Sequence, residues 1–179
     1  MTITIRSATR ADIPILEQLI PESARALSVG FYTPDEIEIA VAHVFGVDTQ
    51  LIDDGTYFIA VIDGTVTGCG GWSRRKTLFG GDQYKAAAAD DLLDPATEPA
   101  RIRAFFVHPD WARRGIGGRI LVACEQAARQ AGFTGLELVA TLPGERLYKA
   151  FGFEEKERFS IDVGGRALPA VRMAKRLPA

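Results

Sequence analysis

Residues 111–118 read WARRGIGG, and this short stretch holds two arginines and three glycines. An amphipathic run follows it, so we expect a helix to begin at Gly115, where about four backbone N–H groups lack partners. Glycine lets the backbone approach an anion closely, and the helix dipole favours negative charge at this end. The stretch therefore predicts a pyrophosphate site made of Arg113, Arg114, Gly115, Gly117 and Gly118.

Two other phosphate-binding patterns do not fit these residues. A P-loop requires a Lys-Ser or Lys-Thr pair after its glycines, and this stretch has none. A dinucleotide-binding fingerprint requires a third glycine where this chain has Ile120. A tight strand-to-helix turn without a ligand is the alternative that the turn alone leaves open.

The elements on either side of the turn follow from periodicity. The run RIRAFFV (101–107) predicts a strand, with Ile102, Ala104 and Phe106 on one face and Arg103, Phe105 and Val107 on the other. Apolar residues then recur every three to four positions from Ile116, which predicts an amphipathic helix. Cys124 lies on the apolar stripe of that helix and is interpreted as a core residue, and Gly132 is a natural C-cap.

The whole chain, residues 1–179, is predicted to form a single domain in which strands and helices alternate. We expect a strand near 2–9, a helix that Pro21 ends or divides, and a further helix from Thr33. Asp63-Gly64 predicts a hairpin between residues 56–63 and 65–72. Residues 73–100 are expected to form a short helix, a lid or a mobile flap. A strand at 135–141, a short helix and a final hairpin complete a mixed α/β sheet with helices on its faces.

Composition excludes several functional classes. The net charge of −2 gives no overall basic field for nucleic acid, and no apolar run is long enough to span a membrane. No signal peptide is visible, and two cysteines and two scattered histidines predict neither a disulfide framework nor a metal site. The pattern is typical of a cytoplasmic globular protein.

Two segments of the chain are similar to those of a known protein family: RAFFVHPDWARRGIGGRIL (103–121) and LYKAFGFEE (147–155). In this order they resemble the GNAT superfamily of acetyl-CoA-dependent N-acetyltransferases. The resemblance implies a mostly antiparallel sheet whose middle strands splay apart. Acetyl-CoA would lie in the gap, its pantetheine arm on backbone groups of Phe106 and Val107. The chain departs from the family pattern at Ala112, where Gln or Arg is usual and for which Arg113 or Arg114 would substitute. It also departs at Thr141, where Asn is common; Thr141 can still donate one hydrogen bond and is expected to contact the cofactor.

The same resemblance implies the chemistry. Tyr148 stands where the family places its general acid, and a phenol with a pKa of about 10 is protonated at neutral pH. The alternative is that Tyr148 only packs. Acetyl transfer needs no covalent enzyme intermediate, and a backbone N–H near Phe106 or Val107 would stabilise the oxyanion. No general base is assigned. The acidic residues considered for it are Glu22, Glu98, Asp110 and Glu137.

Some questions stay open at this level. Phe31 and Tyr32 either line an acceptor pocket or belong to the core. The acceptor is a small amine, an aminoglycoside, an amino acid or a peptide N-terminus. A non-catalytic acyl-CoA sensor or regulatory module on the same fold is the competing function, and open strand edges make a homodimer plausible.

Overall fold

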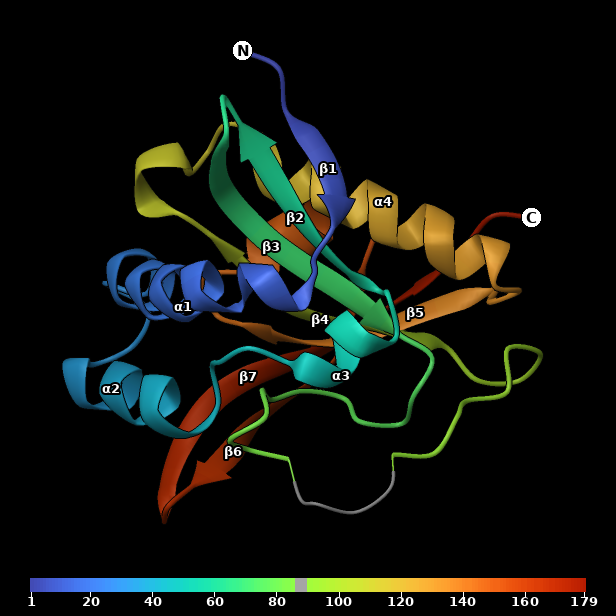
Figure 1. Cartoon of the computed structure of the whole chain (residues 1–179). Coiled ribbons are helices and arrows are strands. Elements are labelled where there is room, and N and C mark those ends of the chain that lie inside the picture. Colours follow the sequence, from blue (N-terminus) through green and yellow to red (C-terminus); the bar gives the residue numbers. More distant parts are fainter. Residues whose placement is uncertain (86–89) are drawn as a thin grey trace.

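A seven-stranded sheet forms the centre of the protein in the computed structural model, which describes residues 1–85 and 90–179 (Figure 1). The strand order is β1-β2-β3-β4-β5-β7-β6, and β4–β5 pair in parallel whereas the other neighbours are antiparallel. The strands are β1 (Thr4–Ser7), β2 (Tyr57–Ile62), β3 (Thr65–Ser73), β4 (Ala100–Val107), β5 (Gly135–Thr141), β6 (Glu154–Val163) and β7 (Arg166–Arg176). The expected mixed, mostly antiparallel sheet is confirmed.

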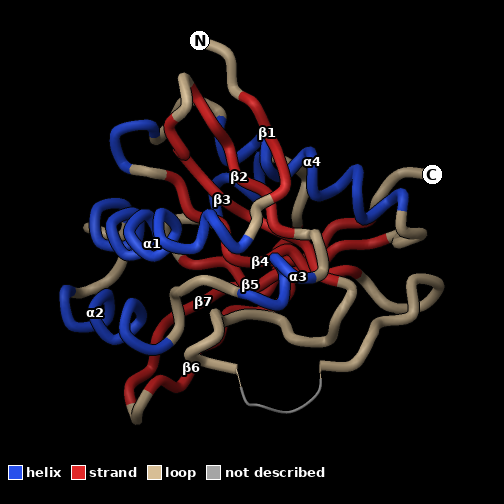
Figure 2. Tube along the Cα trace, viewed as in Figure 1, coloured by secondary structure: helices blue, strands red, loops and turns tan. Residues whose placement is uncertain are grey.

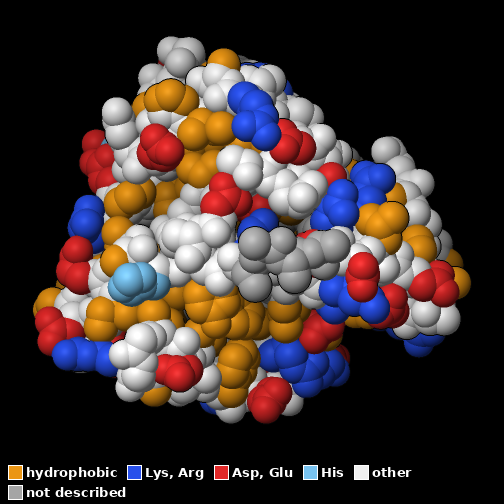
Figure 3. Space-filling model, turned by 60° about the horizontal axis from the view of Figure 1, so that its bottom comes forward, with side chains coloured by type: hydrophobic (Ala, Val, Ile, Leu, Met, Phe, Trp, Pro, Cys, Tyr) orange, Lys and Arg blue, Asp and Glu red, His pale blue; other side chains and the backbone are white. Residues whose placement is uncertain are grey.

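Helices cover both faces of this sheet (Figure 2). The helices are α1 (Ile13–Leu27), α2 (Pro34–His43), α3 (Thr49–Asp53), α4 (Ile116–Gln130) and α5 (Glu145–Ala150). Helix α4 packs on β3 and β2 from one side, whereas α1 crosses the opposite side and α2 lies against β6 and β7. Figure 3 shows hydrophobic side chains gathered in the lower half of one face, between groups of acidic and basic side chains.

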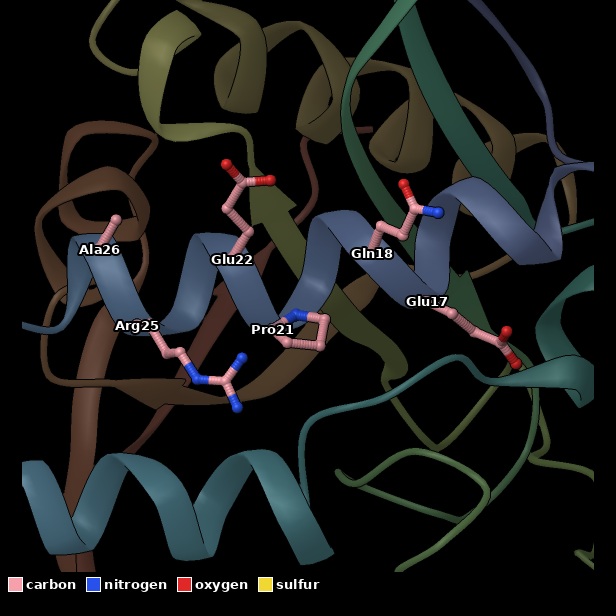
Figure 4. Close-up of a pocket in the computed structure, with 6 residues that line it drawn as sticks. All are labelled: Glu17, Gln18, Pro21, Glu22, Arg25 and Ala26. Carbon is pink, nitrogen blue, oxygen red and sulfur yellow. The ribbon is translucent and has the colours of Figure 1, made fainter.

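Helix α1 differs from the sequence expectation because it runs unbroken through Pro21. A proline inside a helix removes one hydrogen bond. Four apolar residues on the inner face of α1 are buried, and their packing offsets that loss; they are Leu16, Leu19, Ile20 and Ala24. Figure 4 shows Pro21 in the middle of the helix, in a surface hollow that it shares with Glu17 and Glu22.

The long connection after β3 holds no helix in its described parts, residues 74–85 and 90–99, which contain turns and one bridge between Arg75 and Leu92. Of the three alternatives predicted for this segment, the short helix is therefore wrong for those residues. The alanine run at 86–89 lies outside the described residues.

Strand β4 carries a bulge that overturns the predicted alternation of its faces. Ala104 has φ 56°, and Gly70 of β3 stands opposite both Ala104 and Phe105. A Cβ on Gly70 would lie 2.7 Å from the Phe105 ring, so only glycine fits there. The extra residue turns Phe105 onto the α4 face together with Ile102, whereas Ala104 packs on the α1 face.

Candidate functional site

The pairing of β4 with β5 stops soon after it begins. Ala100 pairs with Leu136 and Arg101 with Glu137, and no further pair follows, although β5 continues to Thr141 along β7. The two middle strands therefore splay apart beyond the bulge. A cavity of about 1070 Å³ occupies this region, with residues of both splayed strands in its wall.

The cavity has two ends with different surroundings. The α4 end, as we call it, is formed by residues 112, 113 and 115–118 together with residues 141–150. The α2 end is lined by residues from the loops before and after α2, the segment after β3, and the β6–β7 hairpin. Its principal lining residues are Phe31, Tyr32, Phe45, Leu78, Phe79 and Leu168.

The turn that the sequence predicts to bind phosphate lies at the α4 end. Gly115 is the N-cap of α4 with φ 81°, and no side chain caps the helix among the described residues. The first helical hydrogen bond runs from the Arg119 N–H to the Gly115 carbonyl, 3.1 Å. The first-turn amides of this 15-residue helix thus lie in the cavity wall without a side-chain partner.

The three glycines of the turn serve different purposes. Gly115 adopts a left-handed conformation that other residues rarely accept. A Cβ on Gly118 would lie 2.7 Å from the Phe151 ring, so this glycine lets the chain after α5 pack closely on α4. At Gly117 the nearest atom to an added Cβ is the tip of the Leu147 side chain, 3.1 Å away. A side chain at this position would therefore require only a small shift of Leu147.

The two arginines of the turn, expected to act together, lie in different environments. Arg113 lines the cavity and has a φ of 65°. Arg114 is absent from the lining, and its guanidinium stacks over the Trp111 ring at 5.1 Å. The tertiary structure therefore separates a cavity arginine from a surface arginine, which the sequence alone does not distinguish.

The two β4 residues expected to contact the pantetheine arm also line the cavity. Phe106 pairs with Cys69 of β3, and its ring packs edge-on against Phe45 at 5.7 Å. The backbone N–H of Val107 donates to the Ser23 hydroxyl of α1 over 3.2 Å. Ser23 is buried and lines the cavity, and nothing in its sequence setting indicates this role.

Tyr148, the candidate acid, is buried in the cavity wall on α5. Its ring lies edge-on to Phe105 at 6.0 Å and to Phe153 at 5.7 Å. Burial raises the pKa of the Tyr148 phenol well above its ordinary value, because the phenolate would lose its hydration. The group is therefore held in its protonated form. Thr141, which faces the same cavity, accepts the Gly144 N–H at its carbonyl, 3.0 Å.

Tyr32 also lines the cavity, but its hydroxyl is engaged on both sides. It donates to the Pro169 carbonyl at 2.6 Å and accepts from the Leu142 N–H at 3.0 Å. Burial raises the pKa of Tyr32 to about 12. Tyr32 therefore belongs to both the core and the cavity wall, and Phe31 beside it lines the mouth of the cavity with 53% of its surface exposed.

None of the four acids considered as a base lines the cavity. Glu137 is ion-paired with Arg101 and Arg172, at 2.9 and 3.0 Å. The other three lie at the ends or on the outer surfaces of elements. Glu98 accepts the Asp94 N–H, Glu22 faces His108 and Asp110 lies in the short 3₁₀ turn after β4.

The acid that does line the cavity, Glu145, is paired with Lys149 at 2.7 Å and with Arg158. These two cations lower the pKa of Glu145, with the hydrogen bond from Lys149 as the main cause. Five lining residues are cationic: Arg103, Arg113, Arg146, Lys149 and Arg158. Cations thus outnumber acids in the described wall of the cavity.

Arg103 is a buried cation that the sequence pattern did not single out. Its side chain is 1% exposed, and Nη2 lies 2.8 Å from Asp48 Oδ2. Lys85 Nζ reaches the other Asp48 oxygen at 2.5 Å. Burial lowers the pKa of Arg103, and the nearby Asp48 opposes that shift. This ion-paired group ties the segment after β3 to the centre of the sheet.

Comparison with known proteins identifies the family. The model of the acetyltransferase (GNAT) family matches residues 21–153 of this chain. The chain belongs to the GNAT family. The resemblance inferred from residues 103–155 is thereby confirmed, and the splayed β4–β5 pair lies within the region of the chain that the GNAT family model matches.

Solved structures share the GNAT fold at low sequence identity. A GCN5-related N-acetyltransferase from Rhodopseudomonas palustris matches with TM-score 0.70 and 19% identity, over 99% of this chain and 97% of that one. PaiA N-acetyltransferase from Thermoplasma acidophilum, in complex with coenzyme A, gives 0.65 and 17% over 98% and 99%. YncA from Salmonella typhimurium, with acetyl-CoA, gives 0.63 and 18% over 100% and 96%. No curated protein matches this GNAT chain in sequence.

The described part of the GNAT structure contains neither a metal-ligand cluster nor a helix that could span a membrane. Across residues 1–85 and 90–179, no three His, Cys, Asp or Glu side chains are grouped as metal ligands. None of the described helices has the length and hydropathy to cross a membrane.

Proposed function

We propose that this GNAT protein transfers the acetyl group of acetyl-CoA directly to a primary amine in the gap between β4 and β5. One observation carries the proposal: a single cavity contains both the uncapped N-terminus of α4, with Arg113 beside it, and the buried phenol of Tyr148. The first feature suits a diphosphate, and the second suits a leaving thiolate.

The α4 end of the cavity fits coenzyme A in both charge and shape. The free amides of the first turn, through Gly117 and Gly118, would hold the pyrophosphate, with Arg113 adding charge-assisted hydrogen bonds of about 1.5–3 kcal/mol. The pantetheine arm would run along the freed edge of β4 near Phe106 and Val107, as an added strand does. Thr141 faces the same space from the β5 side.

The reaction follows from these positions. The amine nitrogen attacks the thioester carbon, the C–S bond breaks, and Tyr148 gives its proton to the departing sulfur. The proton lost by the nitrogen passes to solvent, from which Tyr148 is reprotonated. Because cations outnumber acids in the cavity wall, a bound ammonium has a lowered pKa, and this favours the neutral, nucleophilic amine.

Two measurements test this function. Isothermal titration with CoA measures binding, and thiol release from acetyl-CoA in the presence of primary amines measures transfer. The protein's own thiols should contribute little background, because Cys69 and Cys124 are buried and burial raises the pKa of Cys69 to about 12. We expect CoA binding and amine-dependent release. CoA binding without release for any amine favours the sensor function, and absence of binding refutes the proposal.

A charge placed at the turn gives a sharper test of the CoA site. Gly117→Glu puts a carboxylate among the free amides of α4, and we expect it to abolish CoA binding. Gln126→Glu adds the same charge on the exposed side of the same helix, outside the cavity, and serves as the matched control. Equal CoA affinity in the two variants, with both folded by circular dichroism, contradicts the assigned turn.

A further inference from the structure

The α2 end of the cavity is walled by aromatic and aliphatic side chains. Phe31, Tyr32, Phe45 and Phe79 contribute four rings, from the loop before α2, the residues after α2 and the segment after β3. Leu168 and Tyr32 belong to one buried hydrophobic cluster, which residues of α2 form with residues of the β6–β7 hairpin. The wall therefore suits a ligand with an apolar body.

Most of these rings are held in place before any ligand arrives. Phe45 packs on Phe106 at 5.7 Å, and Phe79 packs on Tyr84 at 5.2 Å. Both sides of the Tyr32 hydroxyl are hydrogen-bonded. A preformed apolar wall binds an apolar ligand without the cost of ordering its own side chains.

The charged side chains of the cavity wall are unfavourable to a second cation on the ligand. Among the described lining residues the one acid is Glu145, which Lys149 and Arg158 already pair. Residues 86–89 are alanines in the sequence and bring no carboxylate. Asp48, the ion-pair partner of the lining residue Arg103, is fully buried and is also paired with Lys85. A further ammonium would lose hydration without gaining a counter-ion.

From these observations we infer that the acceptor is a primary amine on an apolar or aromatic body, with no second positive charge. The inference rests on the proposed acetyl transfer and deepens it. It selects hydrophobic monoamines from the acceptors that the sequence left open, and it excludes polycations such as polyamines and aminoglycosides. The amine nitrogen would point toward the β4–β5 gap while the body packs against the rings of the α2 end.

The test compares amines that differ in one property. Hexylamine and 1,6-diaminohexane share an apolar chain and differ by one charge, whereas ethanolamine lacks the apolar body. 2-Phenylethylamine adds a ring. We expect kcat/KM for hexylamine and 2-phenylethylamine to exceed that for the diamine and for ethanolamine by at least about tenfold. Equal values, or a preference for the diamine or for spermidine, overturn the inference.

Binding measured without turnover keeps this inference separate from the proposed reaction. Titration of the same amines into CoA-loaded protein should give the same order of affinity, with 2-phenylethylamine tightest and the diamine weakest. If that order holds but no thiol is released, the acetyl transfer is wrong and the binding class stands. If thiol is released with no preference between hexylamine and the diamine, the transfer stands and the binding class is wrong.

A variant pair at the mouth of the cavity locates the effect. Phe31 lines the cavity and is 53% exposed, whereas Val29 is 72% exposed and is not in the lining. Phe31→Ala should raise KM for 2-phenylethylamine about fivefold without changing CoA affinity, and Val29→Ala should change neither. Phe31→Asp should improve kcat/KM for the diamine relative to hexylamine. If Phe31→Ala leaves KM unchanged and Phe31→Asp leaves the selectivity unchanged, the α2 end is not the acceptor site.

Discussion

The backbone N–H of Val107 donates a hydrogen bond of 3.2 Å to the hydroxyl oxygen of Ser23, which joins the splayed edge of β4 to helix α1. Both residues line the cavity. In the proposed complex the same N–H meets the cofactor, so Ser23 and the cofactor compete for one donor.

This competition predicts the effect of Ser23→Ala. A buried N–H without an acceptor costs about 1–3 kcal/mol, and in the variant that cost falls on the free protein rather than on the complex. We expect the melting temperature to fall by about 2–4 °C and CoA to bind about fivefold more tightly, by titration calorimetry. Ser73→Ala is the control, because Ser73 accepts the Arg75 N–H at 3.0 Å outside the cavity. Weaker CoA binding by Ser23→Ala would show that Ser23 itself holds the ligand.

Tyr148→Phe tests the acid. General acids contribute about 10²–10⁴-fold, and we expect the lower end here, because a thiolate is already a fair leaving group. The variant should lose about a hundredfold in kcat while its CoA dissociation constant stays unchanged. Tyr32→Phe is the comparison: its hydroxyl bonds Pro169 and Leu142, so the change should lower the melting temperature instead. Unchanged kcat in Tyr148→Phe removes the acid assignment.

The two neighbouring arginines should differ in their effect on CoA. Arg113→Ala removes a charge from the cavity wall and should weaken CoA binding about tenfold or more, since charge-assisted hydrogen bonds contribute about 1.5–3 kcal/mol. Arg114→Ala removes the stacking on Trp111, which contributes about 0.5–1 kcal/mol at an exposed site, and should leave CoA affinity within about twofold. Fluorescence or calorimetric titration measures both. Equal losses in the two variants contradict the distinction.

A pH-dependent prediction concerns Asp12, which is paired with Arg6 at 2.8 Å. The hydrogen bond from Arg6 lowers the pKa of Asp12 from 3.8 to about 2, so folding favours the charged carboxylate. Its stabilisation is complete above pH 4 and disappears as pH falls through about 2. Because Arg6 is 46% exposed and solvent screens the pair, we expect Asp12→Asn to cost about 1–2 kcal/mol at pH 7.

Urea unfolding at pH 7, 4 and 2.5 measures this difference in the free energy of unfolding. The gap between wild type and Asp12→Asn should narrow toward pH 2.5. Asp35→Asn breaks a more exposed pair with Arg166 and should cost less than about 1 kcal/mol at pH 7. A gap that stays constant with pH assigns the effect to the capping box that Asp12 forms with Thr9 at the 3₁₀ turn before α1, rather than to the charge.

Local signals in the sequence placed several elements. Asp63 and Gly64 both take positive φ in the β2–β3 hairpin, which is the backbone that an Asp-Gly turn favours. Thr33 and Glu36 form the reciprocal capping box at the start of α2. The motifs of residues 103–121 and 147–155, in that order, were sufficient to indicate the family, because they consist of residue types at fixed spacings along the chain.

The arrangement of the cavity depended on contacts between distant parts of the chain. The bulge at Ala104 reverses the predicted face of Phe105, and it forms because Gly70 on the neighbouring strand leaves room for the ring. Helix α1 continues through Pro21 because its inner face is buried. Neither effect appears in periodicity, which describes one element at a time.

The sequence by itself determined which groups are available at the centre of this protein: a glycine-rich helix start with two arginines before it, a tyrosine after the next strand, and a mixed sheet to hold them. The tertiary structure decided which groups face the shared cavity, turning Arg113 inward and Arg114 onto Trp111, and joining Ser23 to Val107. The physical reason is that residue type and spacing govern local backbone preferences. Which side chain meets which, across 84 residues in the case of Ser23 and Val107, depends on how whole elements pack.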